Sequence, residues 1–364
     1  MRPEATQRRD AREDAATRSD AAPERPASRH VQDVHPALAV RPESRVRSSA
    51  RAFLASFAVH DVVLLVYFFV FVGLVAAGSG EHRSLSALML VADLAWFALA
   101  VTLARITSKQ GRAREVFYRM TLVGLIVASY IQLRWILPVV TSRRVDADLL
   151  ALDLRVFGVE PAIAWDAYVS PTTTEWFAFF YYSYFYLLGA HIFPIAFLER
   201  DEHAVVEFAF GILTIFCVAH ILYVVVPGVG PHLYWKGFHH ELTGDLWWPL
   251  VHNMVDAAGA PTDVFPSLHT AVPTFCALHA FRHRKRHVFR WTWLPTAFVA
   301  LQILISTMFL RWHYMIDVIA GLALSSVVWS SAPVVARWDI SRRRRAWLAP
   351  VFAPLRPWRR RDAS

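Results

Sequence analysis

Charged residues are scarce in this sequence, and long polar segments are confined to its ends. Charged residues make up 18% of the 364 residues, hydrophobic residues make up 55%, and the mean hydropathy is +0.34. A soluble protein of this length would alternate apolar and polar residues at a helical or strand period. Here apolar runs of bilayer-spanning length recur, which excludes an ordinary soluble domain and predicts a polytopic membrane protein.

Cysteine is also rare. The two cysteines, Cys217 and Cys276, both lie inside apolar runs. This placement argues against a disulfide framework or a cysteine zinc site. The sequence also has no glycine-rich phosphate-binding loop, no nucleotide-binding fingerprint and no internal repeat that we can identify.

The basic residues indicate a membrane topology. The net charge is +9, but the lysines and arginines lie in the tails and in short loops between apolar runs, which does not predict a nucleic-acid partner. Residues 1–50 combine arginines, acids, proline and alanine with few large apolar side chains, and we expect a disordered cytoplasmic tail. The first apolar run starts too late and is too long for a cleavable signal.

The apolar runs predict an all-α membrane bundle of about eight transmembrane helices. The expected spans are roughly 53–77, 85–106, 116–140, 175–198, 204–226, 267–281, 291–310 and 313–336. Between the third and fourth spans an amphipathic segment is interrupted by Gly158 and Pro161, and it carries too many acids to span, so we expect an interfacial helix and loop. The aromatic run WFAFFYYSYFYLL favours packing against lipid and the interface over a binding site.

Loop charges predict the orientation. Eight spans place the loops with the most basic residues on one side together with both tails, and the positive-inside rule makes that side cytoplasmic. These basic loops are the segments around Lys109–Arg119, Arg200 and Arg282–Arg290. The loop from Pro227 to Phe265, and the starts of the spans near Ser267 and His313, then face outward in the plasma (inner) membrane.

The strongest candidate for chemistry is the segment RWHYMIDVIAG. It places His313 and Asp317 four residues apart, on one face of a helix and one turn from each other. The carboxylate can accept a proton from one imidazole nitrogen and leave the other free as a nucleophile or base. The alternative is a structural His–Asp pair that ties two helices together.

A second candidate is the segment VFPSLHTA. Pro266 and Ser267 have the composition of a helix N1 position and cap, and His269 falls in the first turn. The unpaired amides of a helix start attract anions, so Ser267 and the neighbouring amides can hold a phosphate. The alternative is a capped helix with an interfacial histidine. Both segments are expected at the same membrane depth, and two histidines with one carboxylate can serve a two-step displacement.

Together these segments resemble the type 2 phosphatidic acid phosphatase (PAP2) superfamily, and most closely its inositol phosphorylceramide synthase-like, inositolphosphotransferase branch. The resemblance implies that His313 is the nucleophile that forms a phosphohistidine, that Asp317 orients it and that His269 is the acid/base. It implies a helical bundle with a six-helix catalytic core. We expect a catalytic membrane domain at residues 141–336, behind N-terminal transmembrane helices at 51–140 and before a basic cytoplasmic tail at 337–364. The resemblance implies no metal and no other cofactor, and a lipid phosphoester as substrate.

The sequence also departs from that family. The Lys…Arg-Pro motif has no counterpart, VVPGVGPHLYWK stands in its place, Leu268 replaces a glycine, and Ser306 and Thr307 stand where Ser-Arg is usual. The phosphate site therefore lacks its usual cations, and Lys236 and Arg311 are the replacements available. The histidines His232, His239 and His240 beside Glu241 can be interpreted as a metal site, although an exposed aromatic loop favours an interfacial role.

Three functions are compatible with these residues. A phosphohistidine discharged to water makes a phosphatase, and one discharged to a lipid or polyol alcohol makes a phosphotransferase. The alternative from another class is a transporter that uses the His and Asp residues as a proton relay. That alternative predicts polar residues along a path through several spans together with inverted repeats, whereas the polar residues here collect at one depth.

Overall fold

The computed structural model describes residues 50–106, 112–260, 262–286 and 289–352. Within these ranges the chain forms helices and no strands, which confirms the predicted all-α, polytopic helical bundle. The predicted disordered tail lies outside the described residues except for Ala50, and so does the basic tail from residue 353 onward.

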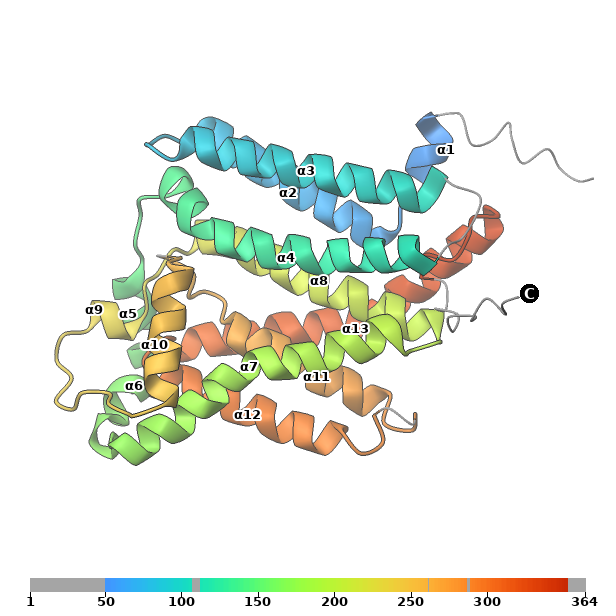
Figure 1. The fold of residues 1–364 in the computed structure, drawn as a ribbon. Coiled ribbons are helices and arrows are strands. Elements are labelled where there is room, and N and C mark those ends of the chain that lie inside the picture. The colour runs from blue at the N-terminus through green and yellow to red at the C-terminus, as the bar shows by residue number, and fades with distance from the viewer. Residues whose placement is uncertain (1–49, 107–111, 261, 287–288, 353–364) are drawn as a thin grey trace, which may run out of the picture. The chain divides into compact units, whose positions relative to one another are not determined.

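Long helices occupy the positions of the eight predicted spans and run alongside one another (Figure 1). They are α2 (Val59–Ala77), α3 (Arg83–Ile106), α4 (Arg112–Val140), α7 (Pro171–Phe197), α8 (Glu202–Val225), α11 (Leu268–Arg282), α12 (Trp293–Phe309) and α13 (Met315–Arg345). Five of them, α2, α3, α4, α8 and α13, are long and apolar enough to cross a bilayer. The other three fall short because α11 and α12 have 15 and 17 residues, and α7 is rich in threonine and tyrosine. Bilayer crossing by these three helices stays a prediction.

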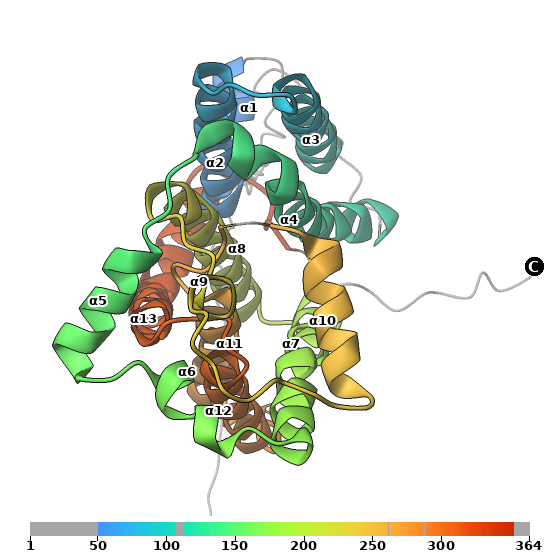
Figure 2. The ribbon, with the colours of Figure 1, turned by 90° about the vertical axis from the view of Figure 1, so that its left-hand side faces the viewer.

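Short helices gather at one end of the bundle, which faces the viewer in Figure 2. They are α5 (Asp146–Phe157), α6 (Pro161–Ala164), a 3-10 turn (Asp166–Tyr168), α9 (Pro231–Tyr234) and α10 (Trp247–Ala258), while α1 (Ala50–Ala55) lies at the opposite end. The predicted interruption is found where α5 stops at Gly158, which has a left-handed φ of 73°. Helix α10 was not expected inside the predicted outer loop. It forms because Val251, Met254 and Val255 share one face and pack with α7.

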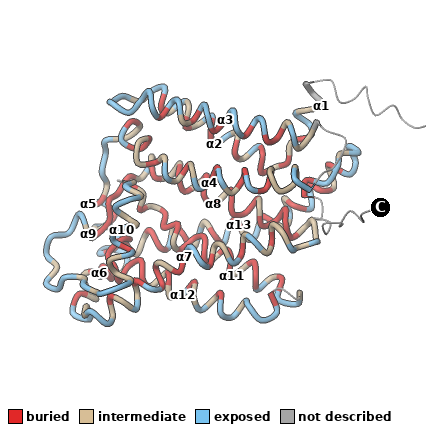
Figure 3. Tube along the Cα trace, in the orientation of Figure 1, coloured by how far each residue is buried: buried red, intermediate tan, exposed pale blue. Residues whose placement is uncertain are grey.

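Helix α8 lies at the centre of the bundle. In its most apolar stretch 61% of the residues are buried, against 28–39% in the other four apolar spans. It packs against α2, α4, α11 and α13, and Figure 3 shows buried residues concentrated on the facing sides of the helices. Gly211 permits the close approach of α11, because a Cβ there would lie 2.1 Å from the Phe275 ring. The outer helices expose large apolar side chains such as Phe69 and Leu88, as a lipid-facing surface requires.

Helix α13 runs past the predicted span end at residue 336 and stops at Arg345. The extra turns are held by polar contacts, since Arg342 Nη2 binds Asp339 Oδ1 at 2.7 Å and Arg343 binds the carbonyls of Ser56 and Ala349. The start of the predicted basic tail is therefore helical. Residues 141–336 contain α7, α8, α11, α12 and most of α13, and the six-helix catalytic core stays a prediction.

Candidate active site

His313 lies in the turn between α12 and α13, at the end of the bundle where the short helices gather. Helix α12 ends at Phe309, and Arg311 takes a left-handed φ of 67° that reverses the chain. The amide of His313 then binds the Thr307 carbonyl at 3.1 Å. This bond ties the turn back to α12 and holds the imidazole at the start of α13.

Asp317 is fully buried in the first turn of α13. Its Oδ2 accepts a hydrogen bond from the Tyr314 amide at 2.9 Å and lies 3.5 Å from Nδ1 of His313, while its Oδ1 has no hydrogen-bond partner. A separation of 3.5 Å is longer than an ordinary N–H···O bond. The structure thus brings the predicted pair together, but in this conformation the carboxylate caps the helix and does not hydrogen-bond the imidazole.

Two acids of α5 position the histidine turn. Asp153 accepts hydrogen bonds from the amides of Met315 and Ile316, at 2.7 and 2.9 Å, and so caps α13 from outside. Burial raises the pKa of Asp153, although these two amides partly offset that effect. Asp146 accepts from the Gly230 amide at 3.0 Å and from the Tyr314 hydroxyl at 3.1 Å. These two acidic residues, which belong to the segment predicted not to span the membrane, therefore cap α13 and anchor the loop.

The loop PGVGPH packs directly on the histidine turn. Gly230 has φ 85°, and a Cβ there would lie 2.4 Å from the Trp312 carbonyl oxygen, so only glycine fits without a shift. The His232 amide donates to the Arg311 carbonyl at 2.9 Å, and its ring packs on the Trp312 ring with centroids 4.1 Å apart. Burial lowers the pKa of His232 to about 4, so this histidine is neutral near pH 7.

The start of α11 lies against α13. The Ser267 amide donates to the Asp317 backbone carbonyl at 3.1 Å. Gly321 allows this close approach, because a Cβ at residue 321 would lie 2.7 Å from the backbone carbonyl oxygen of Ser267. Ser267 is the N-cap residue, but its side chain makes no cap bond and its buried Oγ has no partner. Pro266 precedes the cap and is not at N1 as expected. The first-turn amides of Leu268 and His269 have no acceptor within the helix.

His269 is held between two tyrosines of α7. Its ring stacks on Tyr181 with centroids 4.2 Å apart and an angle of 11°, and its centroid also lies 4.2 Å from that of Tyr184. Its Nε2 is buried and has no hydrogen-bond partner. The aromatic run of α7 was expected to pack against lipid. That prediction was wrong for these two tyrosines, because the helical period turns them inward to the histidine.

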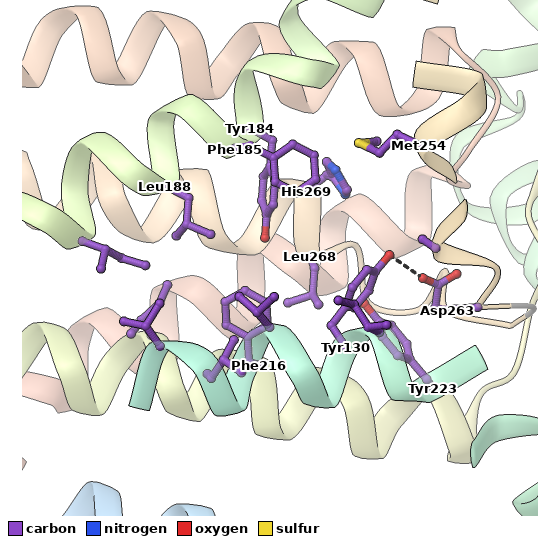
Figure 4. Close-up of a pocket in the computed structure, with 18 of the residues that line it drawn as sticks. Tyr130, Tyr184, Phe185, Leu188, Phe216, Tyr223, Met254, Asp263, Leu268 and His269 are labelled. Atoms are coloured by element: carbon purple, nitrogen blue, oxygen red, sulfur yellow. Dashed lines mark hydrogen bonds between the residues drawn. The ribbon is translucent and has the colours of Figure 1, made fainter. Parts of the chain in front are cut away.

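A cavity of about 870 Å³ joins the two histidines to the middle of the bundle. His269, His313 and Asp263 line one end. Beyond them the lining is mainly apolar side chains of α4, α7 and α8, as far as Ile195 and Val205, where Arg119 of α4, bound to the Ala196 carbonyl, also lines the cavity. Figure 4 shows Tyr130, Tyr223 and Asp263 at the polar end and Leu188 and Phe216 farther in. Most polar groups of the cavity thus lie where the histidines are, and Arg119 is the exception at the other end.

Electrostatics at the polar end favour a neutral imidazole. Burial lowers the pKa of His313 to about 4, and the Asp263 charge and the Val264 carbonyl only partly counter this. Burial also raises the pKa of Asp263, although its bond from the Tyr130 hydroxyl, at 3.0 Å, acts in the opposite direction. At neutral pH His313 is therefore unprotonated, as a nucleophile must be.

The two predicted phosphate-binding cations do not line this cavity. Lys236 is exposed in the loop after α9. Arg311 is buried, and its Nη2 binds Asp166 Oδ1 at 2.8 Å and the His240 carbonyl at 2.6 Å, while its guanidinium lies 3.9 Å from the Phe238 ring centroid. Its charge is already compensated, so neither residue reaches a phosphate at His313 in this conformation.

The loop histidines are held by the same carboxylate. Asp166 accepts from the His239 amide at 2.9 Å and lies 3.2 Å from Nδ1 of His240. Burial alone would raise the pKa of Asp166, but these bonds and the Arg311 charge bring it below its usual value. The cluster anchors the loop to the 3-10 turn, and it accounts for these histidines without a metal.

Several residues at the cavity were not identified from the sequence, namely Asp263, Tyr130, Tyr181 and Tyr184. Asp263 was detectable as an acid four residues before Ser267. The tyrosines of α7 were detectable from their three-residue spacing, which places them on one helix face. Tyr130 was not, because it belongs to α4, in the N-terminal region to which no role in the site was assigned.

A family model described as the PAP2 superfamily matches residues 147–331, which run from the second residue of α5 through α12 and the His313 turn into α13. No curated protein and no solved structure matches the chain.

Proposed function

This chain belongs to the PAP2 superfamily, and we propose that it is an integral membrane enzyme that transfers phosphoryl groups from lipid phosphoesters through a phosphohistidine. The superfamily supports phosphatase-type chemistry in general. The substrate, the acceptor and the residue roles below are our proposal. It includes the division into N-terminal membrane helices at 51–140 and a catalytic membrane domain at 141–336.

The shape and lining of the cavity are the main support for this proposal. A lipid phosphoester needs a polar end for the reacting phosphate and an apolar channel for its chains. The cavity of about 870 Å³ offers both, with His269 and His313 at one end and apolar side chains along α4, α7 and α8 beyond them. A pocket for a soluble phosphomonoester would not need the apolar extension. A proton path across the bundle would need polar groups along its length, whereas the middle of the cavity is lined mainly by apolar side chains between the histidines and Arg119.

The residues support a two-step displacement. Nδ1 of His313 faces Asp317, so the other ring nitrogen attacks phosphorus and forms a P–N bond as the P–O bond to the leaving group breaks. His269 must enter this step as the imidazolium; it gives its proton to the leaving oxygen and becomes neutral. In the second step water or an alcohol gives its proton to His269, forms a new P–O bond and breaks the P–N bond. Both histidines are then back in their starting states.

Phosphate binding is assigned first to the start of α11. The amides of Leu268 and His269 are free of intrahelical acceptors, and the Oγ of Ser267 is buried without a partner, so donors without acceptors converge near the histidines. Lys236 and Arg311 remain secondary candidates. Each requires a movement first, of the exposed loop for Lys236 and away from Asp166 for Arg311.

The acceptor decides between phosphatase and phosphotransferase. We propose the transferase of the inositol phosphorylceramide synthase-like branch as the first reaction to test, because the motif pair PSLH and HYMID resembles that branch. We further propose that the site faces outward from the plasma membrane, since the basic loops predict that the opposite end is cytoplasmic.

The test uses the full chain in lipid nanodiscs. Labelled phosphatidic acid, an isoprenoid pyrophosphate, and phosphatidylinositol with ceramide are supplied separately, and released phosphate is counted against new labelled lipid. His313→Ala is the inactive control. His252→Ala is the matched control, because His252 is a half-exposed histidine of α10 at the same end that pairs with Asp256 at 3.0 Å. No turnover on any of the three substrates, by protein that is folded, would contradict the proposal.

A further inference from the structure

A second cluster of histidines and a carboxylate lies away from the candidate active site. Glu207 of α8, His279 of α11 and His283 just after α11 place one ligand atom each within 4.8 Å of one another. His279 is ten residues along α11 from His269, so the cluster is about 15 Å from the active-site histidine. It belongs to the opposite end of the bundle, where the basic loops gather.

The sequence spacing matches a metal site between two facing helices. His203 and Glu207 are four residues apart on α8, and His279 and His283 are four residues apart at the end of α11. Each pair therefore lies on one helix face, one turn apart. Bundle metal sites are built in this way, from carboxylate and imidazole ligands on facing helices.

The distances are close to those of a tetrahedral site. With metal–ligand bonds of about 2.0–2.1 Å, neighbouring ligand atoms are separated by about 3.3 Å. Oε2 of Glu207 lies 3.2 Å from Nε2 of His283 and 3.6 Å from Nδ1 of His203. Glu207, His279 and His283 already have ligand atoms within 4.8 Å of one another, and His203, which is outside that group, would have to turn toward the ion.

Unpartnered nitrogens point to a missing cation. His279 is fully buried, and neither of its ring nitrogens has a hydrogen-bond partner. The Nε2 of His203 lies 3.2 Å from the Pro333 carbonyl, which can only accept, so in a neutral ring the proton sits on Nε2. Nδ1 of His203 then presents a lone pair to the Glu207 carboxylate. In that neutral state the two acceptors repel each other, and the contact is favourable only when His203 is protonated or a cation lies between them.

The surroundings also have the form of an outer ligand shell. Arg282 Nη1 binds the other carboxylate oxygen of Glu207, and Arg282 Nη2 binds the Trp329 carbonyl at 2.7 Å. Glu207 thereby keeps Oε2 turned toward His283, whose Nε2 lies at hydrogen-bonding distance, 3.2 Å. A backbone carbonyl behind one imidazole and a hydrogen bond to the ligating carboxylate are the usual second-shell partners of zinc ligands.

We propose that Glu207, His279 and His283, with His203 as the fourth ligand, bind a zinc ion that fastens α8 to α11. Imidazole and carboxylate ligands in a tetrahedral arrangement suit zinc better than Mg²⁺ or Ca²⁺, which prefer six or more oxygen ligands. The ion has a structural role. Its ligands lie about 15 Å along α11 from His269, too far to take part in phosphoryl transfer, so the proposal is independent of the proposed function.

The test measures metal directly. The full chain is purified in detergent with an affinity tag that contains no histidine, exposed to zinc, passed over a metal-free desalting column and analysed by plasma mass spectrometry. We expect one zinc ion per chain, a melting temperature that falls on chelation and recovers with Zn²⁺ but not Mg²⁺, and visible absorption bands of tetrahedral geometry after Co²⁺ substitution.

Substitutions test which residues bind the zinc ion. His279→Gln should weaken zinc binding by more than about 100-fold, since even loss of an outer-shell partner costs 10- to 100-fold. His220→Gln is the matched control, because His220 is an equally buried histidine of α8 with an unpartnered Nε2. Zinc retained equally by both variants would overturn the assignment. If His279→Gln does not fold, the wild-type measurements still decide: no retained zinc and no Co²⁺ bands would leave only an ion-pair cluster and would refute the site.

Discussion

The carboxylate of Asp317 lies 3.5 Å from the His313 imidazole and at the same time caps the helix that carries it, through Oδ2 and the Tyr314 amide. One group thus has two separable roles. The capping role needs only an acceptor oxygen, which an asparagine also has. The proposed orienting role needs a negative charge that stabilises the imidazolium.

Asp317→Asn should therefore separate these roles. We expect turnover to fall about 10²- to 10⁴-fold, the usual contribution of an acid–base or orienting group, with little change in melting temperature. Asp317→Ala should lose the cap as well, at a cost of about 1 kcal/mol in stability. Both are measured by thermal unfolding and by turnover in nanodiscs. Unchanged turnover in Asp317→Asn would restrict Asp317 to the structural role.

The two histidines should respond differently to the leaving group. His313→Ala should abolish turnover with every substrate, because no other group attacks phosphorus. His269→Ala should lose mainly the protonation of the leaving oxygen. Its defect should shrink with a nitrophenyl phosphate ester, whose leaving group needs no proton. Equal defects of His269→Ala on good and poor leaving groups would contradict the general-acid role, and activity in His313→Ala would mean another nucleophile.

The dependence of kcat/KM on pH should show the effect of burial on the pKa of His313. Its pKa is lowered to about 4, so the nucleophile is neutral at pH 7 and becomes protonated only as the pH falls through about 4. We expect an acid limb of kcat/KM near pH 4. Because the Asp263 charge raises the pKa of His313, Asp263→Asn should move that limb to lower pH. Asp148→Asn is the control, because Asp148 is an exposed acid of α5 that does not line the cavity. An acid limb near 6.5, as for a solvated imidazole, would contradict the buried nucleophile.

Features that depend on neighbouring residues could be predicted from the sequence, whereas features that depend on contacts between distant segments could not. The apolar runs predicted the long helices, and the His313–Asp317 spacing predicted their neighbourhood, because both depend on residues one turn apart. Helix α10 was missed because its apolar face is completed only by α7. The pairing of Arg311 with Asp166, and of Tyr130 with Asp263, joins residues more than a hundred positions apart. No periodicity encodes such contacts, and the phosphate-binding roles assigned from the sequence to Arg311 and Lys236 therefore stay predictions.

Chelation should separate the proposed zinc ion from the chemistry. Brief treatment with EDTA at low temperature should leave turnover intact, because nucleophile and acid are both imidazoles and the candidate zinc ligands lie about 15 Å from His269. The same treatment should lower the melting temperature. Turnover and unfolding are measured on one sample. Complete loss of turnover while the chain stays folded, restored by a single divalent ion, would contradict the phosphohistidine mechanism.

The orientation of the chain in the membrane can be tested by cysteine labelling. The positive-inside rule predicts that Lys285 is cytoplasmic and that Lys236 faces outward, and both positions are exposed. Contacts within the structure agree that the basic loops share one end, since Arg286, beside Lys285, pairs with Glu199 at 3.5 Å and Arg344 pairs with Glu202 at 3.7 Å.

Lys236→Cys should react with a membrane-impermeant maleimide in intact cells, whereas Lys285→Cys should react only after permeabilisation. The two native cysteines, Cys217 and Cys276, are buried and should give little background. Glu81→Cys, in the exposed turn between α2 and α3, provides a second position expected outside. Labelling at 285 in intact cells, with none at 236 and 81, would invert the topology and place the candidate active site on the cytoplasmic side. The lipid supplied to the site would then have to come from the inner leaflet.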